Sequence, residues 1–305
     1  MPALGLGTWK SKPGEVYEAV RKAIEIGYTH FDCAFVYGNE KEIGQAFADA
    51  FKAGDTQREN LFITSKLWNN KHRAEQTQGA LEGTLSDLGL DYLNLYLIHW
   101  PVVVADHTNF PQSADDLVSL KTTPLEETWG AMVKLKEKGL TRHIGVSNFS
   151  PAKIELVTKA TGVMPEVDQV ESHPFHQQPM LKKYCDENGI IFTAYSPLGS
   201  ADRPANRIVE NEPRLFDNEI INAIAEETNI SPAQVMLAWA VNRGTSVIPK
   251  SVNAERLKQN LAAADISLSA EQMAKLDLVN KDYRYIKGDF WCLEGSDYTL
   301  DSLWG

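Results

Sequence analysis

The chain has 305 residues, and its 30 basic side chains against 41 acidic ones give it a formal net charge of −11. This charge argues against a nucleic-acid-binding protein, which needs a basic face, and no apolar run approaches the roughly 20 residues of a membrane span. Cys33, Cys185 and Cys292 lie far apart and form no paired motif, so we expect neither a disulfide framework nor a metal site. We therefore expect a cytoplasmic protein with reduced thiols.

Short apolar runs alternate along the chain with amphipathic segments of helical period. Strands are predicted at residues 5–9, 29–32, 61–66, 92–98, 143–147, 166–171, 190–195 and 245–248. Helices are predicted at residues 15–27, 40–51, 73–88, 125–138, 151–160, 180–188, 218–228, 232–243 and 254–262. Eight such units in a chain of this length favour an α/β fold of the (β/α)8 TIM barrel type, as a single domain over 1–305. An open doubly wound sheet is the alternative.

Two segments fall outside this repeat. Residues 101–124 are too long for an ordinary connection between a strand and a helix, so we expect a functional loop there. The tail after Leu278 is rich in aromatic side chains. Two interpretations of the tail are open: a lid over the mouth of the barrel, or an irregular extension packed on the surface.

Polar residues stand at or just after the ends of the predicted strands, where (β/α)8 barrels carry their catalytic groups. They are Asp32, Lys66, His99, Asn148, Gln169, Tyr195 and Lys250, with Tyr37 in the short loop after Asp32. Taken singly, each has a structural interpretation: Asp32 and Lys66 could form a buried ion pair, and His99 could be a core histidine. So many polar groups converging on one rim indicate a chemical site.

Three of these residue types together make a proton donor. A tyrosine phenol, with a pKa of about 10, is a poor acid at neutral pH, and we expect the ammonium of Lys66 to bring the pKa of Tyr37 down. The ammonium needs a carboxylate such as Asp32 to stay charged when buried. The set can then protonate a developing alkoxide, while His99 hydrogen-bonds the carbonyl oxygen and orients it.

Longer motifs surround these residues. They include Gly5-Leu6-Gly7-Thr8-Trp9, His30-Phe31-Asp32, Tyr37-Gly38-Asn39-Glu40, Thr64-Ser65-Lys66-Leu67-Trp68, Ile98-His99-Trp100-Pro101, Ile144-Gly145-Val146-Ser147-Asn148-Phe149, Ala194-Tyr195-Ser196-Pro197-Leu198-Gly199 and Ile248-Pro249-Lys250-Ser251. On these motifs the sequence resembles the aldo-keto reductases over essentially its whole length, which is far stronger evidence than one short motif. The resemblance implies an NADPH-dependent reductase of aldehydes, and of some ketones or aldoses. It also implies that Asp32, Tyr37, Lys66 and His99 are the catalytic tetrad.

The resemblance further implies which residues hold NADPH or NADP⁺. Those that match nicotinamide contacts are Ser147, Asn148, Gln169 and Tyr195. Those that match pyrophosphate and adenosine contacts are Ser196, Leu198, Ser200, Lys250, Ser251, Arg256 and Asn260. The charges of Lys250 and Arg256 suit the 2′-phosphate, because a dianion is best held by charge together with the fork of an arginine. A GxGxxG motif after a strand is missing, which excludes a Rossmann dehydrogenase.

An aromatic wall is expected around the substrate. Its predicted members are Trp9, Trp100, Phe110 and Trp291. Such a wall accepts apolar aldehydes and also stacks on sugars, so it does not choose between them. We expect a monomer that acts on a small carbonyl compound, with no nucleic-acid or membrane partner.

Two functions of other classes stay open from the sequence. One is a barrel enzyme that uses Lys66 as a Schiff-base amine, which Asp32 disfavours because it keeps the amine protonated. The other is a non-enzymatic barrel subunit that binds nucleotide, which the intact tetrad disfavours. A requirement for pyridine nucleotide would distinguish a reductase from the Schiff-base enzyme. Turnover of an aromatic aldehyde would distinguish it from the non-enzymatic subunit.

Overall fold

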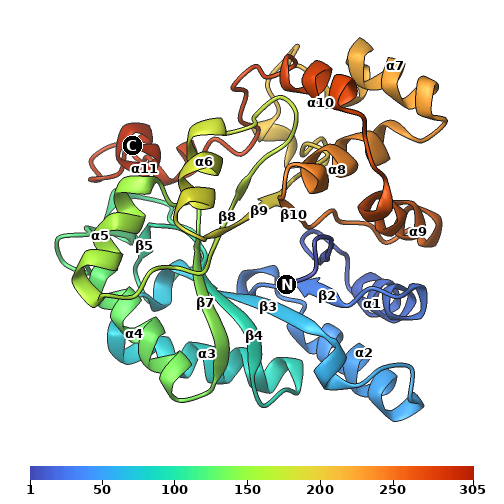
Figure 1. The fold of residues 1–305 in the computed structure, drawn as a ribbon. Helices are drawn as coiled ribbons and strands as arrows, with labels where there is room; N and C mark the ends of the chain where they lie inside the picture. Colours follow the sequence, from blue (N-terminus) through green and yellow to red (C-terminus); the bar gives the residue numbers. More distant parts are fainter.

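The computed structural model of the protein describes residues 1–305. Eight parallel strands form one sheet in the order β1-β2-β3-β4-β7-β8-β9-β10, and helices pack around it (Figure 1). The strands are β1 (Leu6–Gly7), β2 (His30–Asp32), β3 (Phe62–Leu67), β4 (Leu93–Ile98), β7 (Thr141–Ser147), β8 (Val167–Glu171), β9 (Ile191–Tyr195) and β10 (Ser246–Val247). The predicted strands are confirmed, with ends that differ from the predicted ones by one or two residues.

Hydrogen bonds between the first and last strands close the sheet into a barrel. The N–H of Gly5 donates to the carbonyl oxygen of Val247 at 2.8 Å, and the N–H of Val247 donates to that of Ala3 at 2.8 Å. Gly7 lies at the same seam, where a Cβ atom would come within 2.6 Å of the Ile248 carbonyl oxygen. The close approach of the two strands therefore requires glycine there. This closure rules out the open doubly wound sheet and confirms the barrel.

Capping residues mark the ends of several helices. They are α1 (Glu15–Ile26), α2 (Glu40–Ala53), α3 (Ala74–Leu88), α4 (Leu125–Glu137), α5 (Pro151–Thr161), α6 (Pro179–Glu187), α7 (Glu219–Thr228), α8 (Pro232–Asn242) and α9 (Ala254–Ala262). The Ser231 side chain accepts from the N–H of Gln234 at the start of α8, and Gly27 ends α1 in the left-handed conformation. Their apolar faces form one core with the sheet. No helix combines the length and apolarity that a membrane span requires.

The loop at 101–124 and the tail are packed against each other. The loop contains a hairpin that the sequence did not predict, in which β5 (Val103–Val104) pairs with β6 (Leu117–Val118). The tail follows α10 (Ala270–Asp277) and ends in α11 (Leu300–Trp304). The Tyr298 hydroxyl accepts from the N–H of Val103 at 2.9 Å and donates to the carbonyl oxygen of Val118 at 2.8 Å. One side chain thereby joins the tail to both strands of the hairpin.

Candidate active site

The carboxyl ends of the barrel strands open into a cavity of about 470 Å³. This cavity is lined by most of the site residues that were predicted from the sequence. They are Trp9, Asp32, Tyr37, His99, Trp100, Phe110, Ser147, Asn148, Gln169, Tyr195, Ser196, Leu198, Ser200, Lys250, Ser251, Arg256 and Trp291. Two marked residues do not line it: Lys66 lies behind Asp32 and Tyr37, and Asn260 is buried on α9.

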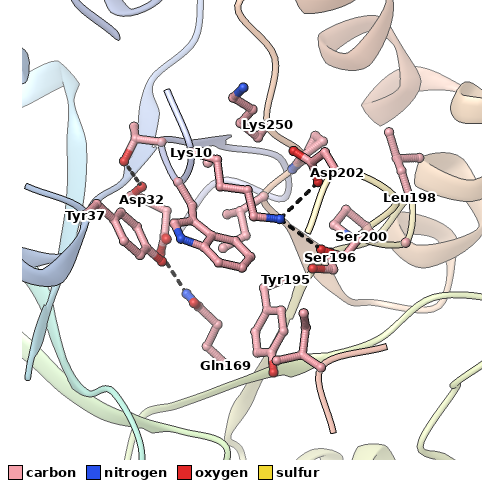
Figure 2. Close-up of a pocket in the computed structure, with 18 of the residues that line it drawn as sticks. Lys10, Asp32, Tyr37, Gln169, Tyr195, Ser196, Leu198, Ser200, Asp202 and Lys250 are labelled. Carbon is pink, nitrogen blue, oxygen red and sulfur yellow. Dashed lines mark hydrogen bonds and ion pairs between the residues drawn. The ribbon is translucent and has the colours of Figure 1, made fainter. Parts of the chain in front are cut away.

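Asp32, Lys66 and Tyr37 form a chain of contacts from the barrel interior to the cavity. Lys66 Nζ donates to Asp32 Oδ1 at 2.5 Å and to the Tyr37 hydroxyl at 3.4 Å. It also donates to the Cys33 carbonyl oxygen at 2.8 Å. The second oxygen of Asp32 accepts from Gln169 Nε2 at 2.7 Å, a contact drawn in Figure 2. Asp32 and Lys66 are each 1% exposed, so this ion pair is shielded from water.

Burial and neighbouring charges have opposite effects on the pKa values of Lys66 and Tyr37. Burial alone would lower the pKa of Lys66, but the attraction and hydrogen bond of Asp32 outweigh burial and raise that pKa. Burial raises the pKa of Tyr37 to about 12, although Lys66 opposes the shift. Lys66 acts on the pKa of Tyr37 in the expected direction, but the expectation of a net lowered pKa is wrong, because loss of solvation outweighs the attraction of the ammonium. The phenol is protonated at neutral pH and is available as a proton donor.

His99 stands beside Tyr37 at the cavity wall. Their ring centroids are 5.9 Å apart and the ring planes are inclined by 79°. Burial, helped by the charge of Lys66, lowers the pKa of His99 well below its ordinary value. The imidazole is therefore neutral at physiological pH, and it can offer one N–H to an oxygen atom in the cavity.

The ends of β7, β8 and β9 are tied together at the floor of the cavity. Asn148 Nδ2 donates to the His99 carbonyl oxygen at 3.0 Å, and Asn148 Oδ1 accepts from the Tyr195 hydroxyl at 2.8 Å. The Ser147 hydroxyl donates to the Gln169 carbonyl oxygen at 2.6 Å. These contacts hold an amide and an aromatic ring in fixed positions next to the Asp32 chain.

The opposite end of the cavity is basic. Lys250 and Arg256 line it, and neither side chain forms an ion pair or a hydrogen bond within the protein. Lys10, in contrast, lies 3.1 Å from Asp202 Oδ1 and 3.3 Å from Ser200 Oγ (Figure 2). The sequence did not predict this bridge between the segments after β1 and β9. Lys10 directly follows a predicted strand, which is a signal that could have found it, whereas Asp202 follows no such pattern.

Comparison with known proteins agrees with this geometry. The model of the Aldo/keto reductase family matches residues 3–281. An aldo/keto reductase of Synechocystis sp. is 54% identical over 304 residues, which cover 100% of this chain and 93% of that protein. Aldo-keto reductase family 1 member A1 of Rattus norvegicus is 46% identical over 288 residues, or 94% of this chain and 88% of that one. The chain belongs to the aldo/keto reductase family.

A solved aldose reductase from Schistosoma japonicum has the same fold as this aldo/keto reductase. The two superpose with a TM-score of 0.87 at 37% sequence identity, over 98% of this chain and 96% of the other. Members of the family reduce carbonyl groups with a nicotinamide cofactor. The barrel, its closure and the position of the cavity therefore all agree with membership of this family.

The loop and the tail of this aldo/keto reductase both contribute aromatic rings to the cavity. Trp291 of the tail lies 5.9 Å from Trp68 and 6.0 Å from Trp100 between ring centroids. Phe110 of the loop lies 5.5 Å from Trp68. Trp68 was missing from the predicted wall, although it closes one of the motifs of the sequence. The tail therefore forms part of the cavity wall, which agrees with a lid better than with a separate surface extension.

Buried Glu171, at the end of β8, holds the tail in place. Its carboxylate accepts from the backbone N–H groups of Tyr285 at 2.7 Å and Ile286 at 2.8 Å, and lies 2.9 Å from His173 Nε2. Burial opposes the charge of Glu171, but these hydrogen bonds outweigh burial and lower its pKa. Because Ile286 lines the cavity, Glu171 positions one of its walls.

Proposed function

We propose that the protein reduces aldehydes, and more slowly ketones or aldoses, to alcohols with NADPH. The observation that supports this most directly is the buried Asp32–Lys66–Tyr37 chain, which ends in the cavity beside neutral His99. His99 donates a hydrogen bond that orients the carbonyl oxygen. Tyr37 gives its phenolic proton to that oxygen as negative charge develops there. Lys66 stabilises the phenolate that remains, and solvent then returns the proton.

The residues present fit the cofactor by their chemistry. NADPH, when bound, supplies the hydride that reduces the carbonyl carbon. Lys250 and Arg256, which have no partner in the protein, would hold its 2′-phosphate together with the Ser251 hydroxyl. Ser196, Leu198 and Ser200 would hold its pyrophosphate. Tyr195 would contact its nicotinamide, and Ser147, Asn148 and Gln169 would hold the carboxamide.

The geometry weakens the Schiff-base alternative. A lysine must lose its proton to attack a carbonyl carbon, but Lys66 Nζ is surrounded by Asp32, the Cys33 carbonyl oxygen and Tyr37. The attraction of Asp32 raises the pKa of Lys66 in spite of burial, so the amine stays protonated. The second alternative, a non-enzymatic nucleotide-binding subunit, is left for the assay below.

Oxidation of NADPH, followed against aldoses, aliphatic aldehydes and aromatic aldehydes, tests the proposal. We expect turnover of aldehydes, most readily of apolar and aromatic ones that fit the tryptophan wall. Binding of NADPH without turnover of any of these compounds would favour the non-enzymatic subunit. The monomeric state and the cytoplasmic location stay predictions from the sequence. Light scattering would measure the molar mass in solution and so test the monomeric state.

A further inference from the structure

A second cavity, of about 450 Å³, shares no lining residue with the active-site cavity. It lies where the first turns of α5 and α6 meet the tail, and Figure 1 shows α11 beside these two helices. Apolar side chains make up much of its lining, among them Phe149, Val170, Leu181 and Trp304. Met180, which is 78% exposed, also lines it and marks its opening to solvent. The volume lies in the roughly 300–1,000 Å³ range of small-molecule sites.

Arg284 gives this cavity a positive charge that no carboxylate of the protein contacts directly, although buried Glu171 attracts it. Its guanidinium stacks on Trp304, with Cζ 3.5 Å from the ring centroid. Nη1 is buried and has no hydrogen-bond partner, and the guanidinium forms no ion pair. A buried N–H without an acceptor destabilises the folded protein. An anion from outside would supply that acceptor.

The nearby carboxylates accept no hydrogen bond from Arg284. Glu171 is already occupied by the N–H groups of Tyr285 and Ile286 and by His173. Asp282, whose side chain is 85% exposed, lies 3.0 Å from His176 Nδ1 instead. The charges of Glu171 and Asp282 attract Arg284, but neither carboxylate accepts a hydrogen bond from it, so its buried Nη1 remains open to an acceptor from a ligand.

His176 is a second polar group with an unused hydrogen-bonding atom. It lines the cavity and is only 4% exposed, yet neither Nδ1 nor Nε2 has a hydrogen-bond partner, although Nδ1 lies 3.0 Å from Asp282 Oδ1. Burial lowers the pKa of His176 to about 4, so the ring is neutral at physiological pH. The cavity thus combines one cation, one neutral imidazole and an apolar part with the polar side chains of Ser150, Gln178, Asn280 and Asp282.

We propose that this cavity binds a small organic carboxylate with an apolar body. The carboxylate would pair with Arg284, and the body would pack on Phe149, Val170 and Leu181. A monoanion fits better than a phosphate dianion, because Arg284 is the only cation in the lining and Glu171 and Asp282 already place negative charge near it. The apolar lining favours an organic acid over an inorganic ion.

Calorimetric titration of the full-length protein with phenylacetate tests this proposal. We expect phenylacetate to bind and its uncharged analogue phenylacetamide to bind at least about tenfold more weakly. Arg284→Gln should weaken phenylacetate by about tenfold or more. Lys287→Gln is the matched control, because Lys287 is an exposed cation of the same tail that lines neither cavity; it should leave the affinity unchanged.

Two further variants keep the test decisive if Arg284→Gln does not fold. Met180 is exposed at the opening, so Met180→Glu and Met180→Lys should fold normally and shift the affinity a few-fold in opposite directions, weaker and tighter. Crystals soaked with 4-bromophenylacetate should place bromine in this cavity. Any of three results would overturn the proposal. They are bromine found only beside Tyr37, phenylacetamide that binds as tightly as phenylacetate, and equal affinities of Met180→Glu and Met180→Lys for phenylacetate. None of these outcomes depends on turnover of an aldehyde.

Discussion

Replacement of Lys250 and Arg256, the two cations at the basic end of the cavity, should abolish the preference of the protein for NADP⁺ over NAD⁺. A hydrogen bond to a charged group contributes about 1.5–3 kcal/mol, and the exposure of Arg256 puts its contribution at the low end. Since about 1.4 kcal/mol corresponds to a factor of ten, Lys250→Ala and Arg256→Ala should each weaken NADP⁺ roughly tenfold. The double variant should weaken it roughly a hundredfold, with NAD⁺ nearly unchanged.

Quenching of tryptophan fluorescence by the two dinucleotides gives the Kd values that this prediction needs. Lys258→Ala is the control, because Lys258 is an exposed cation on the same helix as Arg256 but does not line the cavity. Higher salt should reduce the preference, since the screening length falls from about 10 Å at 0.1 M to about 3 Å at 1 M. Equal wild-type affinities for NADP⁺ and NAD⁺, or an equal loss in Lys258→Ala, would refute the assignment of the two cations to the phosphate.

Tyr37→Phe should lower kcat about 10²–10⁴-fold while NADPH still binds; near-normal kcat would remove Tyr37 as the acid. Lys66→Met should abolish activity without loss of the fold, and Asp32→Asn should reduce activity less. If both variants keep a near-normal kcat, the ion pair has no part in the mechanism. Tyr298→Phe leaves a buried backbone N–H unpaired and should cost about 1–3 kcal/mol in denaturant unfolding, with KM rising more than kcat falls. Burial raises the pKa of Glu40 to about 7, so its contribution to stability declines as pH rises from about 4.5 to about 7; Glu40→Gln should flatten that decline, and an unchanged pH profile would contradict it.

The sequence predicted the site residues that lie at the ends of the barrel strands, because each follows an apolar run. Asp32, Lys66 and His99 each end or follow a strand whose apolar period is visible in the sequence, and parallel strands in a barrel bring such ends together. The bridge from Lys10 to Ser200 joins residues 190 positions apart, and no local period marks such a pair. The sign of the pKa shift of Tyr37 was missed for another reason: the ammonium is visible in the sequence, but the depth of burial that outweighs it appears only in the folded chain.

The seam between the first and last strands has a consequence for how the protein folds. Gly5 and Val247 are hydrogen-bonded neighbours, yet about 240 residues of chain separate them. Contacts of such high sequence separation form late, because the entropy of closing the intervening chain is lost before the contact stabilises anything. During synthesis at about 5–20 residues per second, β1 waits roughly 12–50 s for its partner strand to be made. Until β10 is made, the β1 side of the sheet has no partner strand, and an unpaired edge of this kind promotes aggregation.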